Sequence, residues 1–96
     1  MSRILEKRDL TDVTRLFRVE APLIAASAEP GQFIILRVRE DGERIPLTIA
    51  DYDRDSGTIT IVVQEVGATT RILGGLEPGD EILDIVGPLG DPADVP

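Results

Sequence analysis

Apolar and polar residues alternate with a period close to two along most of the chain, and Gly, Pro and Asp residues separate the alternating runs. This pattern is typical of short, half-buried β-strands. The breaks at Asp41-Gly42 and Ser56-Gly57 are short, and glycine there favours a tight turn between antiparallel neighbours. We predict six strands, at residues 3–8, 14–21, 32–39, 45–49, 58–66 and 80–86.

Two parts of the chain resemble each other. Residues 29–36, which begin Glu-Pro-Gly, are similar to residues 77–84, and each segment follows an apolar run. Three strands cannot bury their apolar face alone, so two such halves would interlock. We therefore predict an all-β fold, a closed six-stranded antiparallel barrel of Greek-key-like topology with pseudo-two-fold symmetry. Because Pro-Gly turns before strands are common, a chance similarity is the alternative.

One segment, residues 67–75, departs from the strand pattern. It begins with Gly67 and two threonines suited to a helix start, continues with Ile72 and Leu73, and ends in two glycines. It predicts one short helix after the fifth strand, lying across an end of the barrel.

The composition removes many kinds of chemistry. Ten basic against eighteen acidic residues give a net charge of -8, which disfavours nucleic-acid and anionic-membrane partners. The absence of Cys and His excludes disulfides, thiolate metal sites and the commonest general base, so we predict no metal site and no catalytic side chain. With neither a signal-peptide pattern nor an apolar run near the ~20 residues of a membrane span, we expect a cytoplasmic protein.

Three short motifs, each weak alone, stand in an order typical of one protein family. Over residues 4–90 the chain resembles the flavin domain of the ferredoxin–NADP reductase superfamily. Within it the resemblance is to the branch that contains the electron-transfer subunit of dihydroorotate dehydrogenase and the small subunit of NADH-dependent reduced ferredoxin:NADP oxidoreductase. The motifs are Arg44-Ile45-Pro46-Leu47-Thr48-Ile49-Ala50-Asp51, then Val66-Gly67-Ala68-Thr69-Thr70, then Gly87-Pro88-Leu89-Gly90.

The resemblance implies an FAD-binding module of an electron-transfer oxidoreductase. Residues 1–90 would be the barrel, and residues 91–96 would begin the linker to a nucleotide-binding domain that this chain lacks. The parent family also implies an iron–sulfur partner subunit. We expect the chain alone to be inactive with NAD(P)H, and its surface near Leu89 to be apolar enough to favour a homodimer.

The resemblance also implies a role for each residue of the first motif. Thr48 would place its hydroxyl near the flavin N5, Leu47 would replace the aromatic wall usual in the family, and backbone groups from Ile49 to Asp51 would face the polar edge of the ring. The sequence departs from the family because Arg44 lies one position early, and one step on a strand reverses the face. Arg44 and Arg71 both remain open as the cation that meets the diphosphate.

The helix start suits the diphosphate of FAD on chemical grounds, because free N–H groups at a helix N-terminus bind anions. Gly67 would allow close approach, and the Thr70 hydroxyl would add a donor. Thr69 stands where related proteins often have Gly. The candidate cofactor-binding residues are therefore Arg44, Pro46, Leu47, Thr48, Ile49, Ala50, Asp51, Val66, Gly67, Thr69 and Thr70.

Two other interpretations follow from the same residues. The spacing of Asp51, Asp53 and Asp55 resembles the start of a calcium loop, but the later Gly and Glu do not fall at the required offsets, so we prefer a solvated turn. The motifs taken singly are also ordinary strand, cap and turn sequences. The alternative function is a cofactor-free barrel that serves as an interaction, assembly or engineered minimal-fold module.

Overall fold

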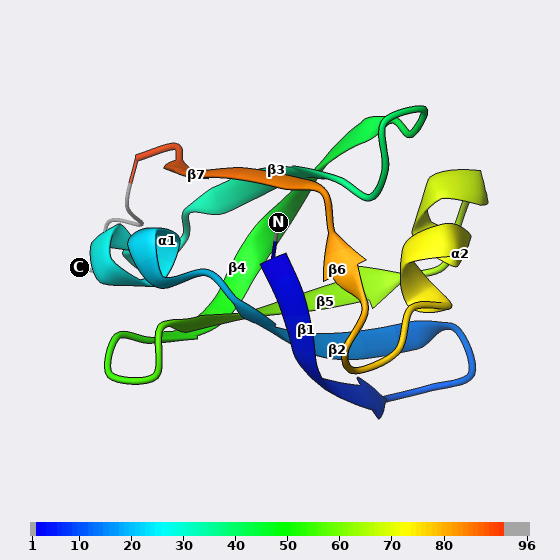
Figure 1. Cartoon of the computed structure of the whole chain (residues 1–96), viewed down its shortest axis with the longest axis horizontal. Coiled ribbons are helices and arrows are strands. Elements are labelled where there is room, and N and C mark those ends of the chain that lie inside the picture. The colour runs from blue at the N-terminus through cyan, green and yellow to red at the C-terminus, as the bar shows by residue number, and fades with distance from the viewer. Residues whose placement is uncertain (1, 92–96) are drawn as a thin grey trace.

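The computed structural model describes residues 2–91, which form a single barrel with one helix at each end of its long axis (Figure 1). The strands alternate with these helices in a β-β-α-β pattern that occurs twice. The elements are β1 (Ser2–Asp9), β2 (Thr14–Glu20), α1 (Pro22–Ser27), β3 (Phe33–Arg37), β4 (Arg44–Asp53), β5 (Thr58–Gln64), α2 (Ala68–Gly74), β6 (Glu81–Ile82) and β7 (Asp84–Leu89).

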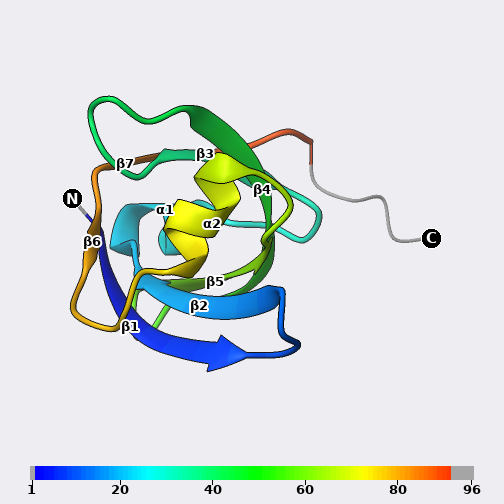
Figure 2. The same cartoon turned by 90° about the vertical axis from the view of Figure 1, so that its right-hand side faces the viewer.

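The sheet is antiparallel and runs in the order β6-β1-β2-β5-β4-β3-β7. Its two outer members, β6 and β7, are consecutive in the chain and only Leu83 separates them, so the sheet curls round and its edges meet (Figure 2). The expected all-β barrel is thus confirmed. The predicted strand 80–86 is not one strand, however, because the chain changes partner at Leu83 from β1 to β3 and donates there to the Val38 carbonyl at 3.1 Å.

The pseudo-two-fold symmetry is visible in the pairing. Exchanging the first half (β1, β2, β3) with the second (β4, β5, β6–β7) leaves the order of neighbours unchanged. The two Glu-Pro-Gly turns are equivalent as well, since Gly31 and Gly79 both have positive φ, 87° and 95°. Each turn is closed by the following side chain: Glu29 N–H donates to Gln32 Oε1 at 2.9 Å, and Glu77 N–H to Asp80 Oδ2 at 2.7 Å.

The same symmetry extends to the hydrogen bonds between these turns and the strands β1 and β4. Ile49 N–H donates to the Gln32 carbonyl at 3.0 Å, and Ile4 N–H donates to the Asp80 carbonyl at 2.9 Å. Directly after Ile4 and Ile49, both strands shift register through a β-bulge. These matched contacts favour a structural repeat over a chance similarity of sequence.

The helix expected over residues 67–75 is present as α2 and lies across one end of the barrel (Figure 2). A second helix, α1, was not predicted and covers the other end. Six residues are too few for helical periodicity to show in the sequence, although Pro22 at the first helical position is a start signal. Since α1 follows β2 as α2 follows β5, the repeat itself predicts a second helix.

The core is built from aliphatic side chains with Phe17 as the one fully buried aromatic residue among those described. Inward positions alternate with outward ones along each strand, as the period of two requires. The helices contribute Ile24 and Ala25 from α1 and Leu73 from α2, which plug the two ends. Within residues 2–91 no helix is long and apolar enough to cross a membrane.

Candidate cofactor-binding site

The strand β4 carries most of the predicted site residues, and its pleat divides them between two faces. Pro46 and Thr48 are exposed on the outer face, whereas Leu47 and Ile49 turn inward and pack on the core. Leu47 is half-buried and presents only part of its side chain outside. The outer surface of this strand is therefore formed mainly by Pro46 and Thr48, to which Leu47 adds part of its side chain, and the aliphatic wall expected of Leu47 stays a prediction.

Arg44 lies on the same outer face as Pro46 and Thr48, since it stands two and four positions before them. Ile45, which occupies the usual place of the family arginine, instead packs against the core. On the neighbouring strand β3, Arg37 donates two hydrogen bonds to Asp84 Oδ2 of β7, from Nε at 2.9 Å and from Nη2 at 2.7 Å. Arg44 Nη1 lies farther from that oxygen, at 3.7 Å, so its pairing is loose.

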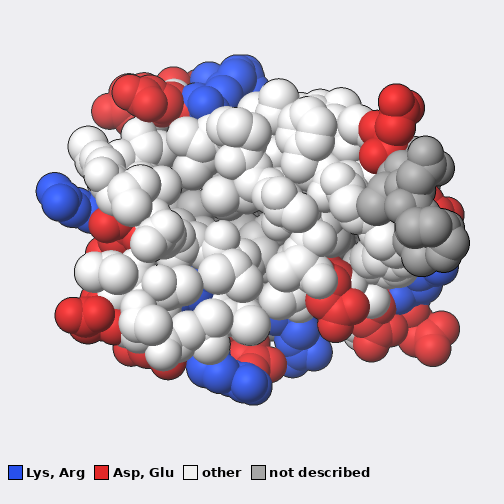
Figure 3. Space-filling view, turned by 180° about the vertical axis from the view of Figure 1, so that it is seen from behind, with Lys and Arg blue, Asp and Glu red and all other residues white. Residues whose placement is uncertain are grey.

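A hollow of about 360 Å³ lies on the outer face over β3 and β4. This volume is within the range of small-ligand sites. Figure 3 shows the side of the barrel on which β4 lies, with uncharged side chains at the hollowed centre and Lys, Arg, Asp and Glu around the margin. The hollow is lined by Gly31, Phe33, Pro46, Leu47 and Thr48.

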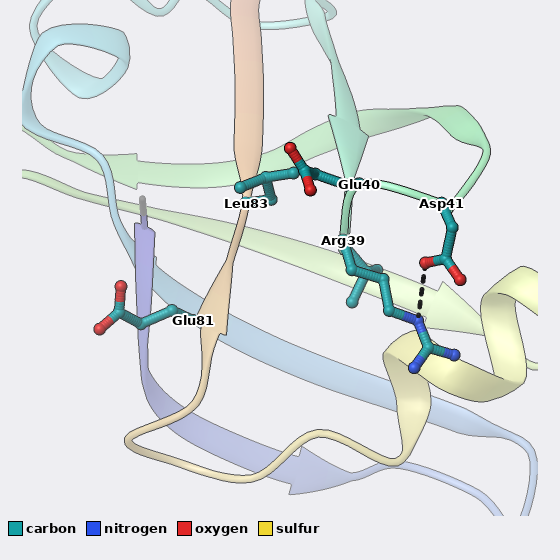
Figure 4. Close-up of a pocket in the computed structure, with 6 residues that line it drawn as sticks. Arg39, Glu40, Asp41, Glu81 and Leu83 are labelled. Carbon is teal, nitrogen blue, oxygen red and sulfur yellow. Dashed lines mark ion pairs between the residues drawn. The ribbon is translucent and has the colours of Figure 1, made fainter.

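A larger hollow, of about 490 Å³, lies between the β3–β4 hairpin and β6 (Figure 4). None of the predicted site residues lines it. Three of its side chains are carboxylates, and Asp41 pairs with Arg39 at 3.6 Å. Because carboxylates repel a diphosphate and do not favour an apolar ring, the smaller, uncharged hollow is the better candidate. The lining residues are Val38, Arg39, Glu40, Asp41, Glu81 and Leu83.

The start of α2 lies at the end of the barrel from which β4 begins (Figure 1). The Thr70 hydroxyl accepts hydrogen bonds from the N–H groups of Val66 and Gly67, both at 3.0 Å, and donates to the Gly67 carbonyl at 3.1 Å. Its hydrogen-bonding capacity is then used within the turn. Thr70 thus shapes the helix start, and its hydroxyl is not free to bind a ligand as we had expected.

The backbone of this turn remains open. Among residues 2–91 no partner is found for the N–H groups of Ala68 and Thr69, which lie in the first turn. A Cβ added at Gly67 would meet no atom within 4 Å, and Val66 beside it is 71% exposed. The helix start therefore offers free donors and space for close approach.

The bulge in β4 lies next to the hollow. The register with β5 passes from Ile49 opposite Ile61 to Asp51 opposite Thr60, which leaves Ala50 without an opposite residue. Bulges disrupt the ladder locally and are frequent beside active sites. We expected backbone groups of residues 49–51 at the polar edge of the ring. The Ile49 N–H is already bonded to the Gln32 carbonyl, and Ala50 is the residue whose pairing with β5 is interrupted by the bulge.

The acidic cluster that resembles a calcium loop serves the β4–β5 turn. Asp53 Oδ1 accepts from the N–H groups of Asp55 at 3.0 Å and Ser56 at 3.2 Å, and Asp51 Oδ1 accepts from the Tyr52 N–H at 2.8 Å. The hydrogen bond from the Ser56 backbone is the main cause of a lowered pKa at Asp53. Within residues 2–91 no group of three or more His, Cys, Asp or Glu side chains could hold a metal ion.

Two lining residues of the hollow, Gly31 and Phe33, were not among the predicted site residues. Both belong to the Glu-Pro-Gly segment that was noticed only as a repeat. Phe33 reaches the hollow because β3 pairs with β4 in a register that sets it opposite Thr48. Such pairing between distant segments cannot be read from local alternation.

Comparison with known proteins adds independent findings. The family model described as oxidoreductase FAD-binding domain matches residues 2–93. The chain is 41% identical over 95 residues to a Thermotoga maritima protein named as a homologue of the dihydroorotate dehydrogenase B (NAD(+)) electron transfer subunit, a match that covers 99% of this chain and 34% of that protein. It is 52% identical over 94 residues to the "uncharacterized protein in adh 3′ region" of Clostridium beijerinckii, with 98% and 32% covered.

The fold is also found in a solved structure of an NADH-dependent reduced ferredoxin-NADP oxidoreductase, described in a study of flavin-based electron bifurcation. The two superpose with a TM-score of 0.96 at 41% identity, over 98% of this chain and 34% of that one. The chain thus spans about a third of the length of the relatives it matches.

Proposed function

This chain belongs to the oxidoreductase FAD-binding domain family, as the order of its motifs predicted, and we propose that it holds FAD on the outer face of β4, with the isoalloxazine in the hollow and the diphosphate at the start of α2. The observation that carries this proposal is that an uncharged hollow lies over β4, while an open, donor-rich helix start lies at the end of the barrel from which β4 begins (Figure 1). FAD, when bound, supplies the capacity to accept a hydride and pass electrons on singly.

The ring site rests on Pro46 and Thr48. These side chains are outward and uncharged, and Leu47 adds part of an aliphatic edge. The Thr48 hydroxyl has no hydrogen-bond partner among residues 2–91, so it is available to a polar atom of the ring. The interrupted ladder at Ala50 leaves backbone groups that suit the polar edge of the ring, between Ile49 and Asp51.

The diphosphate site rests on the backbone of residues 67–70. The free N–H groups of Ala68 and Thr69 would donate to phosphate oxygens, and Gly67 and Val66 leave room for these oxygens. Arg71 lies one turn farther along α2, and helical side chains lean toward the N-terminus, so it can cover this turn. Arg71 and Arg44 are the cations available, and Arg71 has no ion-pair partner among residues 2–91.

Titration of the purified chain with FAD and with FMN, followed by flavin fluorescence, tests this proposal. We expect FAD to bind more tightly, because FMN lacks the diphosphate. Equal or tighter binding of FMN would remove the diphosphate from the start of α2. A colourless chain that binds neither flavin would favour the cofactor-free interaction barrel.

For the whole protein we propose what the parent family implies: a barrel at residues 1–90, a linker that begins at 91–96, a nucleotide-binding domain, and an iron–sulfur partner subunit in the cytoplasm. The T. maritima relative is by name a homologue of an electron transfer subunit, which supports partner subunits. Residues 92–96 lie outside the described part of the chain. The homodimer stays a prediction, and Val86, which is 50% exposed on β7, is one apolar side chain on the strand that ends at Leu89.

A further inference from the structure

Gln32 is a buried polar residue beside the hollow over β3 and β4. Its two neighbours in the chain, Gly31 and Phe33, both line that hollow. Its carbonyl accepts a hydrogen bond from the Ile49 N–H of β4 at 3.0 Å. The backbone of Gln32 therefore joins the start of β3 to β4 at the hollow.

The side chain of Gln32 bridges two segments that are distant in the sequence. Its Oε1 accepts from the Glu29 N–H at 2.9 Å, and its Nε2 donates to the Gly90 carbonyl at 2.8 Å. The partners determine which end of the amide is which, because an N–H group must meet the oxygen and a carbonyl must meet the nitrogen. Both ends of the buried amide are thus bonded, and the side chain ties the Glu-Pro-Gly turn to the chain that leaves β7.

The internal repeat shows that the bond to Gly90 is not needed to close the turn. At the equivalent position of the second turn, Asp80 Oδ2 accepts from the Glu77 N–H at 2.7 Å. A carboxylate closes this turn as an acceptor alone, since it has no hydrogen to donate. The amide of Gln32 adds a donor, and its bond to Gly90 is a separate contact.

The chain leaves the barrel next to a residue that lines the hollow. Leu89, the last residue of β7, lies opposite Phe33. Gly90 follows with a φ of +83°, and a Cβ there would lie only 3.0 Å from Cε1 of Phe33. Because the relatives are about three times as long as this chain, the direction taken at Gly90 bears on everything that follows the barrel in a protein of that length.

We propose that Gln32 is a positioning residue: its bond to Gly90 fixes the direction in which the chain leaves the barrel, at the rim of the hollow. Without this bond the backbone at Gly90 can rotate, because glycine has a wide choice of conformations. A following domain would then begin at a variable distance from the flavin, whereas fast transfer requires reacting groups in a fixed geometry. This consequence rests on the proposed function, but the bond to Gly90 itself needs no flavin.

Two substitutions of Gln32 test the bond. Gln32→Glu keeps the length of the side chain and the acceptor for the Glu29 N–H but removes the donor to Gly90. Gln32→Met removes both bonds without burying a charge, and it serves if Gln32→Glu does not fold. Asp80→Ala is the matched control, because it removes the equivalent turn bond to Glu77 and leaves the bond to Gly90 in place.

NMR relaxation of the ¹⁵N-labelled chain, without flavin, measures the order of the backbone at Gly90 and Asp91. We expect an order parameter of about 0.85 at Gly90 in the wild type and in Asp80→Ala, and a fall to below about 0.6 in the folded Gln32 variants. Thr48 should stay equally ordered in all of them. Wild-type order at Gly90 in folded Gln32→Met, or the same loss of order in Asp80→Ala, would overturn the role of Gln32.

A second measurement determines how the chain exit is placed relative to the flavin. The chain has no Cys, so Asp91→Cys can be labelled at one site with a dye that accepts energy from FAD. Time-resolved energy transfer should give a narrow distribution of flavin–dye distances with Gln32 and a broader one with Gln32→Met. If the distribution stays equally narrow although Gly90 has lost its order, the positioning role is wrong.

The two proposals can fail separately. If the wild-type chain binds no FAD, the proposed function fails, while the order at Gly90 still decides whether Gln32 fixes the chain exit. If the wild type binds FAD and Gly90 is equally ordered with and without the Gln32 side chain, only the inference about Gln32 is wrong.

Discussion

The substitution Gly67→Ala separates binding of the diphosphate from stability of the fold. Gly67 has φ -154°, an extended conformation that alanine adopts as readily, and the new Cβ would meet no protein atom within 4 Å. The methyl group would project into the space where the diphosphate approaches the N–H groups of the first turn. The fold should therefore tolerate a change that the cofactor does not.

The two effects differ in size. Alanine is a poorer N-cap than glycine, but it also restricts the unfolded chain, and the two terms offset each other to within about 0.5 kcal/mol, or about 2–4 °C in Tm. Displacing one charge-assisted hydrogen bond to a phosphate oxygen costs about 1.5–3 kcal/mol. This loss corresponds to a roughly 10- to 150-fold rise in the Kd for FAD.

Fluorescence titration and thermal unfolding measure both effects on the same samples. Gly75→Ala at the other end of α2 is the matched control, because its Cβ would make only ordinary contacts, 3.5 Å from the Arg71 carbonyl. We expect the control to bind FAD normally. An unchanged Kd for FAD in a folded Gly67→Ala would refute the placement of the diphosphate at this turn.

Further predictions concern single side chains and the reduction of the flavin. Thr48→Val should weaken FAD binding by about 1 kcal/mol or shift the reduction potential, and unchanged values would leave Thr48 a simple strand former. Arg54→Ala should lower stability by about 1 kcal/mol and Tm by about 4–8 °C without affecting FAD binding, because Arg54 donates to the Ala26 carbonyl in α1 at 3.3 Å and to the Ala28 carbonyl just after it at 2.6 Å. A changed Kd would contradict this. The pKa of Asp53 is lowered in the fold, so the ionised side chain stabilises the folded chain above the unfolded pKa, and this stabilisation is lost as pH falls through the folded pKa. The free energy of unfolding of Asp53→Asn, measured in urea, should therefore depend less on pH below about 4 than that of the wild type. Dithionite should reduce the FAD-loaded chain readily, whereas NADPH or NADH should reduce it only at a rate near that of free FAD. The reason is that residues 2–91 hold no glycine-rich strand-to-helix loop to keep a nicotinamide within about 3–3.5 Å of the flavin. Rapid, saturable bleaching of the flavin by NADPH or NADH in stopped flow would contradict this.

The strands could be predicted because each outward and inward position is set by local alternation. The repeat at residues 29–36 and 77–84 correctly indicated the symmetric barrel, since identical turns place equivalent strands. The change of partner at Leu83 could not be predicted, because it depends on which strands lie on either side of it. The helix α1 was missed for a related reason: it has one turn of local signal and owes its position to the barrel end that it covers.

The site was only partly predictable. Pro46, Thr48 and Gly67 lie where the motifs put them, on the outer face and at the helix start. Thr70 could not be assigned from sequence, since a hydroxyl at this position either meets a ligand or caps the turn, and the structure has it bonded to Val66 and Gly67. Phe33 depends on the β3–β4 register, which sequence alternation leaves open.

A two-dimensional NMR titration of the ¹⁵N-labelled chain with FAD tests the central claim, the location of the cofactor, most directly. We expect the largest amide shifts at Phe33, at Thr48 and Ala50, and at residues 67–70, with little change at Leu10 or along α1. Largest shifts instead at the hollow near Arg39 and Glu81, or no shifts at saturating FAD, would contradict a flavin site on the outer face of β4.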